Sequence, residues 1–249
     1  MSDADLPPAP RLLDRHFRWR GSDVSRLEGF SDAVFAIVLA LLFLRAAPPE
    51  TFTDLKAAMK ALVPFAASFA IIAYVWIEHW LFSRRYDLHD GWTTFLNLLL
   101  LFLLLFYAYP LKFLFTLICI AVFGPIGSVT REHLLQGFEG EGDLVRLFVF
   151  YGVGYGAIFG VIALMYVRAL MLEKRLGLNA VERFLTRAGI WQCLLQSGVA
   201  AVSIAVALIG IELNAGLPGW VYGAIGPAMA VHGMWEGRRV RALEAGART

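Results

Sequence analysis

Residues 25–44 read SRLEGFSDAVFAIVLALLFL, a polar start followed by an uninterrupted apolar run. Ser25 and Glu28 have the spacing of a capping box, which predicts that a helix begins here. At 1.5 Å per residue, Asp32 lies about 10 Å along this helix. An ionisable side chain at that depth in a membrane is costly unless it faces protein or water. The stretch therefore predicts a membrane helix that carries a functional or assembly site.

The polar and apolar side chains of this helix fall on different faces. Asp32 points about 140° away from Ile37, at about 100° per residue. The helical phase also gathers an apolar stripe about 80° wide, which contains Phe30, Ala33, Ile37, Leu41 and Leu44. Asp32 and this stripe are therefore expected to serve two different surfaces.

The composition is that of an integral membrane protein. Of the 249 residues, 59% are hydrophobic and only 17% are charged, which is more apolar surface than one soluble core can bury. Six apolar stretches are long enough to cross or nearly cross a bilayer: 27–46, 61–82, 93–123, 147–170, 189–211 and 218–236. The third is too long for one straight span, and Pro110 predicts either a kink or an early exit into an interfacial segment.

The distribution of Lys and Arg predicts the orientation. Sixteen of the 22 basic residues fall before residue 27, at 84–85, at 168–187 or at 238–248, and basic loops stay in the cytoplasm. We therefore expect an all-α protein with six transmembrane helices and both termini cytoplasmic. Its parts are an N-terminal segment (1–24), a transmembrane domain (25–236) and a C-terminal tail (237–249). The net charge of +2 gives no indication of nucleic-acid binding.

Polar residues of the next two spans fall near the depth of Asp32. Trp76 and His79 lie toward the cytoplasmic end of the second span, and Asn97 lies about one turn inside the third. They could converge with Asp32 in a hydrogen-bonded cluster that ties three helices together. Alternatively, each is satisfied separately at the interface, with Trp76 and His79 as ordinary belt residues.

Residues 26–37 carry the pattern Arg-x-x-x-Phe-Ser-Asp-Ala-x-Phe-Ala-Ile, which resembles the opening signature of the transmembrane protein 175 family of potassium channels. Later segments resemble the second and third helices of that family in order and spacing: Ser68-Phe69, Trp76-x-x-His79 and Asn97-Leu-Leu-Leu-Leu-Phe. The resemblance covers most of the chain, strongly to about Pro110 and mainly by topology afterwards.

The resemblance implies a homotetramer in the cell inner (plasma) membrane, with the first helix of each subunit lining a central pore for potassium. It implies a hydrophobic constriction at Ile37, with further apolar rings at Leu41 and Leu44. The family signature and its polar network map onto Arg26, Phe30, Ser31, Asp32, Trp76, His79 and Asn97. No metal or other cofactor is implied.

Two positions depart from the family pattern. Ala40 stands where many relatives carry a threonine that is associated with the ion path and with selectivity. Trp80 replaces the second of two histidines common in this region.

A pore of isoleucine and leucine rings has no carbonyl or carboxylate ligands, so it must select through width and dewetting. We expect passive conduction with modest selectivity for potassium.

Two other classes of function remain as alternatives. An intramembrane enzyme could use Asp32, Glu78 and His79 as acid and base groups, although the sequence has no nucleophile motif and no HExxH helix. A secondary transporter is nearer, but the sequence lacks evident repeats and broken helices at matching positions. Passive potassium flux would separate a channel from both.

Overall fold

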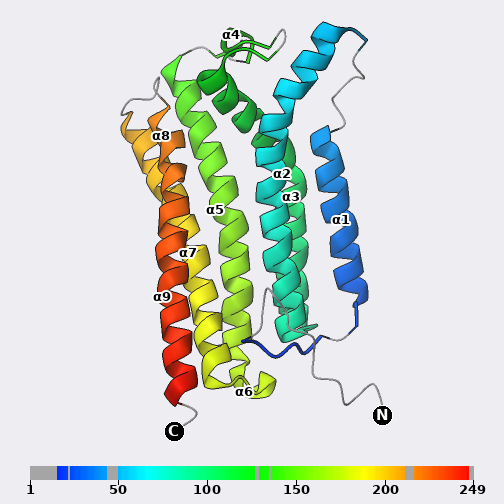
Figure 1. Ribbon diagram of the computed structural model, residues 1–249, viewed down its shortest axis with the longest axis vertical. Helices are drawn as coiled ribbons and strands as arrows, with labels where there is room; N and C mark the ends of the chain where they lie inside the picture. The colour runs from blue at the N-terminus through cyan, green and yellow to red at the C-terminus, as the bar shows by residue number, and fades with distance from the viewer. Residues whose placement is uncertain are drawn as a thin grey trace.

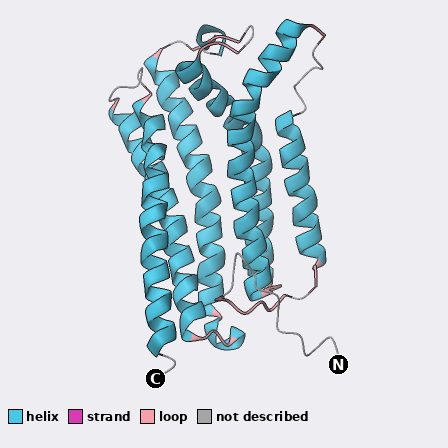
Figure 2. Cartoon of the chain, viewed as in Figure 1, coloured by secondary structure: helices cyan, strands magenta, loops and turns pink. Residues whose placement is uncertain are grey.

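The computed structural model describes residues 16–21, 23–43, 50–126, 129–134, 136–138, 140–210 and 216–246. Figure 2 shows that this part of the chain is helical apart from short connections. Its elements, including the short 3-10 helix η2, are α1 (Arg26–Phe43), α2 (Phe52–Tyr86), α3 (Gly91–Phe123), α4 (Arg131–Leu134), α5 (Glu141–Met171), α6 (Glu173–Leu176), α7 (Ala180–Ile209), α8 (Leu217–Trp220), η2 (Val221–Ala224) and α9 (Ile225–Gly246).

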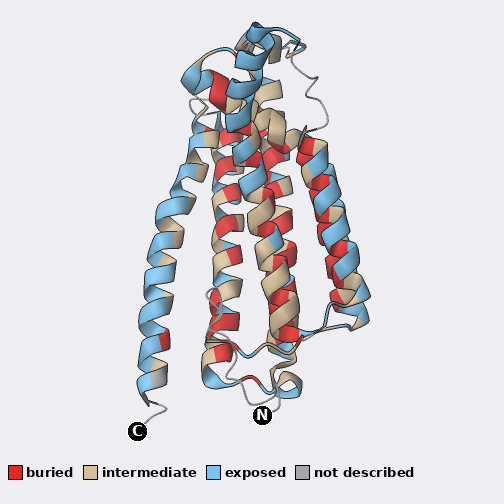
Figure 3. Ribbon diagram, turned by 45° about the vertical axis from the view of Figure 1, so that its right-hand side comes forward, coloured by how far each residue is buried: buried red, intermediate tan, exposed pale blue. Residues whose placement is uncertain are grey.

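The long helices run side by side along one axis (Figure 1). α1 packs against α2 and α3 at one edge, α5 packs against α2, α3 and α7, and α9 packs against α7 and η2. Figure 3 shows α9 standing apart from the other helices along much of its length. The bundle end at which α1 begins and α9 ends carries Arg20, Arg84, Arg85 and Arg183, and we call it the basic end.

Within the described residues, four helices are long and apolar enough to cross a membrane: Phe52–Tyr86, Gly91–Phe123, Gly142–Met171 and Ala180–Ile209. They correspond to the second to fifth predicted spans. α1 has only 18 residues and carries Arg26, Glu28 and Asp32 among them. At 1.5 Å per residue it still extends about 27 Å, nearly the thickness of a hydrocarbon core.

The third predicted span is a single helix that continues through Pro110. Proline removes a backbone donor and strains the preceding turn of a helix. Figure 1 shows that the last part of α3, coloured dark green, leans away from the axis of its first part. The Pro110 carbonyl accepts a hydrogen bond from the Tyr151 hydroxyl of α5. The structure therefore shows that the helix does not end at Pro110 but continues to Phe123.

Glycine brings α5 close to α7. A Cβ built on Gly152 would lie 2.4 Å from Cγ1 of Ile204 and 3.3 Å from the Ala200 carbonyl oxygen. A Cβ on Gly156 would make an ordinary 3.6 Å contact with that of Ala200. At Gly160, by contrast, no described neighbour lies within 4 Å of the added atom. The close approach of the two helices therefore depends on Gly152.

Replacing Gly152 by leucine is expected to lower the free energy of unfolding, because the larger side chain must displace Ile204 or separate the helices. Overpacking of this kind costs about 1–3 kcal/mol. Gly160→Leu is the matched control, since it adds the same side chain on the same helix with open space around it. Thermal unfolding of the purified variants in detergent measures the difference, and equal midpoints would contradict this packing.

A short segment before α1 crosses the basic end of the bundle, and we call residues 16–21 the N-terminal strap. Phe17 is buried against Tyr86, with ring centroids 5.3 Å apart. The backbone N–H groups of Arg20 and Gly21 donate to the Arg84 carbonyl at 3.0 and 3.2 Å. The strap therefore packs on α2, which the division of the sequence into a terminal segment and a transmembrane domain did not anticipate.

An ion pair joins the N-terminal strap to α7. The Arg20 guanidinium donates to Oε2 of Glu182 at 2.9 Å, and the Arg18 backbone N–H donates to Oε1 at 3.0 Å. Glu182 also accepts from the backbone N–H of Asn179 in a capping box that begins α7. Only 1% of its side chain is exposed. One buried carboxylate thus ties the segment before α1 to the start of another helix.

The connection between α2 and α3 is held at the same end by Asp90. This residue immediately precedes α3, and its carboxylate accepts from the Thr93 hydroxyl at 2.6 Å and from Arg168 of α5 at 3.0 Å. Burial alone would raise the pKa of Asp90, but the hydrogen bonds from Thr93 and Arg168 outweigh it and hold the pKa below its usual range. The α2–α3 connection is therefore anchored to α5.

Candidate functional site

α1 has one face buried against α2 and α3 and one face exposed on the subunit (Figure 3). Ser31 and Val38 are fully buried, whereas Phe30 and Ile37 are 53% and 54% exposed. The alanines at 33, 36 and 40 lie on the exposed side as well. The exposed face of α1 (residues 30, 33, 36, 37 and 40) is therefore apolar, and the exposed charged residues Arg26 and Asp32 lie at its start and along its edge.

The residues predicted to line a pore differ in how exposed they are on the single subunit. Ile37 lies on the exposed face of α1, and Leu41 lies at its flank with intermediate exposure. Leu44 lies outside the described residues.

The end of α1 is held by Lys112 of α3, whose ammonium group donates to the Leu42 carbonyl. Sequence reasoning missed this contact, although a lone lysine in an apolar stretch is a signal for a partner of this kind.

Behind this face, three helices are joined by one chain of hydrogen bonds. Asn97 of α3 donates through Nδ2 to the Ser31 hydroxyl of α1 at 3.0 Å, and that hydroxyl donates to the Leu27 carbonyl. The Asn97 oxygen lies 2.7 Å from Nε2 of His79 on α2. Because an amide oxygen only accepts, His79 carries its proton on Nε2 and donates it. Ser31, Asn97 and His79 form the inner network, which is almost completely buried.

Asp32 takes part in a separate contact at the edge of the subunit. Trp76 donates from its indole nitrogen to the Asp32 carboxylate at 2.9 Å, and both side chains are exposed. Trp76 stacks on Trp80, with ring centroids 6.4 Å apart, and Trp80 packs edge-on against Trp19 of the N-terminal strap. Trp80, which departs from the family pattern, thus extends the contact of Asp32 toward the strap.

Arg26 does not join either group within the part of the chain that the structure describes. Its side chain is exposed at the first turn of α1. The neighbouring acid Glu28 pairs instead with Arg84 of α2 at 3.2 Å, and the Glu28 backbone N–H donates to the Ser25 hydroxyl at 3.1 Å. The start of α1 is therefore capped as predicted by Ser25, while the Glu28 side chain holds α1 to α2.

A second polar cluster, which sequence reasoning missed as a unit, joins α2 to α5 and α7. Gln192 donates to Glu78 at 2.9 Å and to the Tyr74 hydroxyl at 2.6 Å. The Tyr166 hydroxyl donates to the other Glu78 oxygen at 3.2 Å. Tyr74 and Glu78 are four residues apart and so lie on one face of the helix. This spacing was the feature of the sequence that could have indicated the cluster. Hydrogen bonds therefore satisfy a carboxylate in the middle of the subunit.

The three acid and base groups of the enzyme alternative face different neighbours. Asp32 bonds to Trp76, His79 bonds to Asn97, and Glu78 bonds to Gln192 and Tyr166. General acid–base catalysis requires such groups to lie within reach of one substrate. Among the described residues there is also no group of three or more His, Cys, Asp or Glu side chains placed to hold a metal ion. The geometry thus offers no common reaction centre for these residues.

Comparisons with known proteins agree with the resemblance seen in the sequence. The profile of the family described as endosomal/lysosomal potassium channel TMEM175 matches residues 26–107, which contain α1, α2 and the first half of α3. A protein of Marivirga tractuosa named "Potassium channel" is 39% identical over 234 residues, which cover 93% of this chain and 95% of that protein.

The solved structures include a similar protein. It is the potassium channel MtTMEM175, crystallised as a threonine-to-alanine variant in complex with a nanobody–MBP fusion protein. The two chains share 39% identity and superpose with a TM-score of 0.75, and the match covers 90% of this chain and 97% of that one. The relatives are channels, not enzymes. This multi-pass membrane protein therefore belongs to the TMEM175 family of potassium channels.

Proposed function

We propose that the chain assembles as a homotetramer around a central potassium pore lined by α1. The observation that carries this proposal is the exposed face of α1, which is apolar from Ala33 to Ala40 while the opposite face packs on α2 and α3. In four copies arranged around an axis, Ile37 would form the constriction. Leu41 and Leu44 would add further rings beyond it.

The exposed Asp32 supports assembly over a solitary subunit in lipid. A carboxylate that faces hydrocarbon is costly, and such groups face protein or water in membrane proteins. Asp32 has Trp76 as a partner, yet both remain exposed on the single subunit. A neighbouring copy packed along this edge would cover the pair, and the exposed face of α1 would then turn toward the axis.

An apolar ring would select through the cost of removing water from the ion. It offers no oxygen ligands, so a permeating ion must give up part of its hydration without replacement. Potassium releases water more easily than sodium, so a narrow Ile37 ring would favour potassium. Ala40 adds no hydroxyl one turn beyond Ile37. The proposed selectivity for potassium is therefore modest.

The proposed topology has six spans, formed by α1, α2, α3, α5, α7 and residues 218–236 of the segment from α8 to α9, whose last turns continue beyond the span to Gly246. Both termini and the basic end would face the cytoplasm, since Lys and Arg concentrate there. The N-terminal segment (1–24) and the tail (237–249) would then be cytoplasmic. We place the channel in the cell inner (plasma) membrane.

Potassium flux into liposomes tests the proposed activity. Purified protein in vesicles with a potassium gradient should pass potassium rapidly and without added nucleotide, and sodium more slowly. A transporter would show slow, saturable exchange that depends on a coupled ion. The absence of flux from vesicles that contain assembled protein would contradict the channel.

Replacing Asp32 by asparagine is expected to weaken assembly while single-channel conductance stays close to that of the wild type. The amide oxygen can still accept from Trp76, but the bond loses its charge and about 1 kcal/mol of strength. Trp76→Phe, which keeps an aromatic ring and removes the donor, should have the same effect. Size-exclusion chromatography and single-channel recording measure the two properties. A normal oligomer with reduced conductance would mean that Asp32 lines the ion path.

A further inference from the structure

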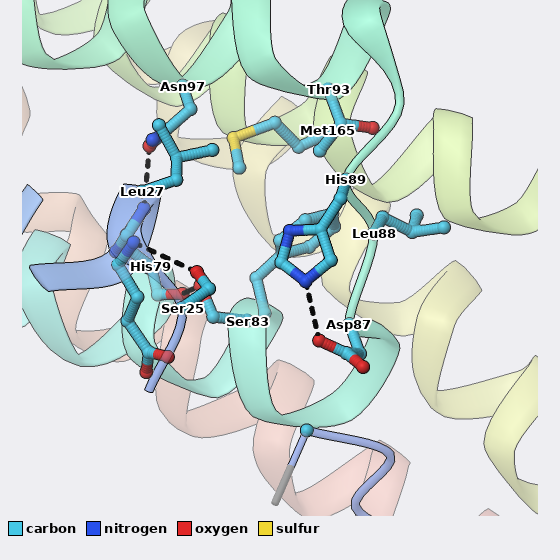
Figure 4. Close-up of a pocket in the computed structure, with 13 residues that line it drawn as sticks. Ser25, Leu27, His79, Ser83, Asp87, Leu88, His89, Thr93, Asn97 and Met165 are labelled. Carbon is cyan, nitrogen blue, oxygen red and sulfur yellow. Dashed lines mark hydrogen bonds and ion pairs between the residues drawn. The ribbon is translucent and has the colours of Figure 1, made fainter. Parts of the chain in front are cut away.

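A small cavity lies between α1, α2 and α3 at the basic end of the bundle (Figure 4). Its volume is about 30 Å³. Eight of its 13 lining residues are polar, among them Glu28, His79, Ser83, Asp87 and Asn97. The cavity therefore adjoins the inner network at His79 and Asn97.

His79 has one nitrogen with no partner in the described residues. Its Nε2 donates to Asn97, so Nδ1 carries a lone pair that can only accept. Nδ1 is buried and has no hydrogen-bond partner among the residues that the structure describes, and the whole residue is only 3% exposed. An unsatisfied buried acceptor destabilises the folded protein. A donor in the cavity would remove this cost.

Two of the three hydroxyl groups that line the cavity donate their protons elsewhere, and the third, that of Ser25, accepts from the Glu28 backbone N–H. Ser83 donates to the His79 carbonyl at 3.1 Å, and Thr93 donates to the Asp90 carboxylate at 2.6 Å. The Glu28 carboxylate is paired with the Arg84 guanidinium, and the Asp87 carboxylate accepts a hydrogen bond from Nε2 of His89 at 2.8 Å. Both carboxylates of the lining thus have partners, whereas Nδ1 of His79 calls for a small donor.

We propose that this cavity is a water-binding site and that a bound water donates a hydrogen bond to Nδ1 of His79. A buried water needs about 10–15 Å³ of such space and two to four polar partners, so the cavity has room for about two molecules. The water would complete a chain of donors that continues through His79 and Asn97 to Ser31. Water would enter past Asp87 and His89, which are exposed at the basic end. His79 is then hydrated from this end and not from the ion path.

Ser83 provides a pair of variants that separate filling the cavity from losing a hydroxyl. Ser83→Leu places an apolar side chain in the cavity and displaces water. Ser83→Ala loses the same hydrogen bond to the His79 carbonyl and leaves the space open. Both are compared with the full-length wild type in lipid bilayers, after chromatography shows that the three proteins form the same oligomer.

Water-edited solid-state NMR of protein labelled with ¹⁵N-histidine measures contact between water and the His79 ring. Rapid transfer of magnetisation from water to Nδ1 is expected in the wild type and in Ser83→Ala, with at least a severalfold loss in Ser83→Leu. The Nδ1 shift should be that of a hydrogen-bonded acceptor. Slow transfer in the wild type, or equally rapid transfer in Ser83→Leu, would overturn the proposal. A signal that changes when potassium is exchanged for sodium would also overturn it, since the occupant would then be a cation.

Discussion

Ile37→Asn is expected to raise the permeability of sodium relative to potassium by about fivefold, which corresponds to roughly 1 kcal/mol of barrier. The amide side chain would supply donors and acceptors at the constriction, so both ions would keep or replace more of their hydration there. Sodium gains more, because its hydration is the more costly to remove. Reversal potentials in planar bilayers with potassium on one side and sodium on the other measure this ratio.

The control for this change is Leu164→Asn. Leu164 is a comparably exposed apolar residue, at 49%, but it lies on α5 and not on α1. The same polar side chain there should leave the permeability ratio unchanged. An unchanged ratio in Ile37→Asn, or an equal change in both variants, would show that Ile37 does not form the constriction.

Glu182→Ala should cause the largest loss of stability, about 3–5 kcal/mol, because it leaves the mostly buried Arg20 guanidinium without its counter-charge. The carboxylate accepts from Arg20, from the Arg18 backbone and from the Asn179 backbone. Its loss would free the N-terminal strap and remove the capping box of α7 together. Chemical unfolding in detergent measures the effect, and release of the strap should increase proteolysis near residue 20.

Arg183→Ala is the control, because it measures the loss of stability when an ordinary exposed ion pair in the same region is removed. Arg183 pairs with Glu173 at 2.9 Å, but 45% of its side chain is exposed. Exposed pairs contribute at most about 1 kcal/mol. A loss in Glu182→Ala no greater than that in Arg183→Ala would mean that the strap is not held by the buried pair.

The phase of α1 shows how much the sequence alone could predict. A regular helix fixes the angles between its residues, so placing Ile37 away from Ser31 and Asp32 required only the spacing. The structure agrees that Ile37 is exposed and Ser31 is buried. Asp32, however, lies at an exposed edge of the subunit rather than inside it. The choice of neighbour depends on how α2 packs beside α1, and helical spacing does not contain that information.

For the polar residues, too, the sequence predicted the depth in the membrane but not the hydrogen-bond partners. Their sequence positions placed Asp32, Trp76, His79 and Asn97 at similar depth, which left one cluster or separate contacts as alternatives. The structure brings them together in two groups: Asp32 bonds to Trp76, and His79 bonds through Asn97 to Ser31. Which residues become hydrogen-bond partners depends on which side chains the packed helices bring within bonding distance. Only the three-dimensional structure shows this.

Contacts between distant segments were beyond prediction. The N-terminal strap reaches Glu182 across more than 160 positions of sequence, and no periodicity links residues so far apart. The course of α3 through Pro110 was open for a related reason: whether proline kinks or ends a helix depends on partners for the freed backbone groups. Here α3 continues, and Tyr151 of α5 binds the Pro110 carbonyl.

A structure of the assembled protein in lipid nanodiscs tests the central claim, that the exposed face of α1 lines the ion path. We predict four copies around one axis, with the Ile37 side chains at the narrowest point and Val38 turned away into each subunit. The Asp32–Trp76 pair should be covered by the neighbouring copy. A monomer, or an assembly in which Ile37 contacts lipid and another helix lines the axis, would contradict this account.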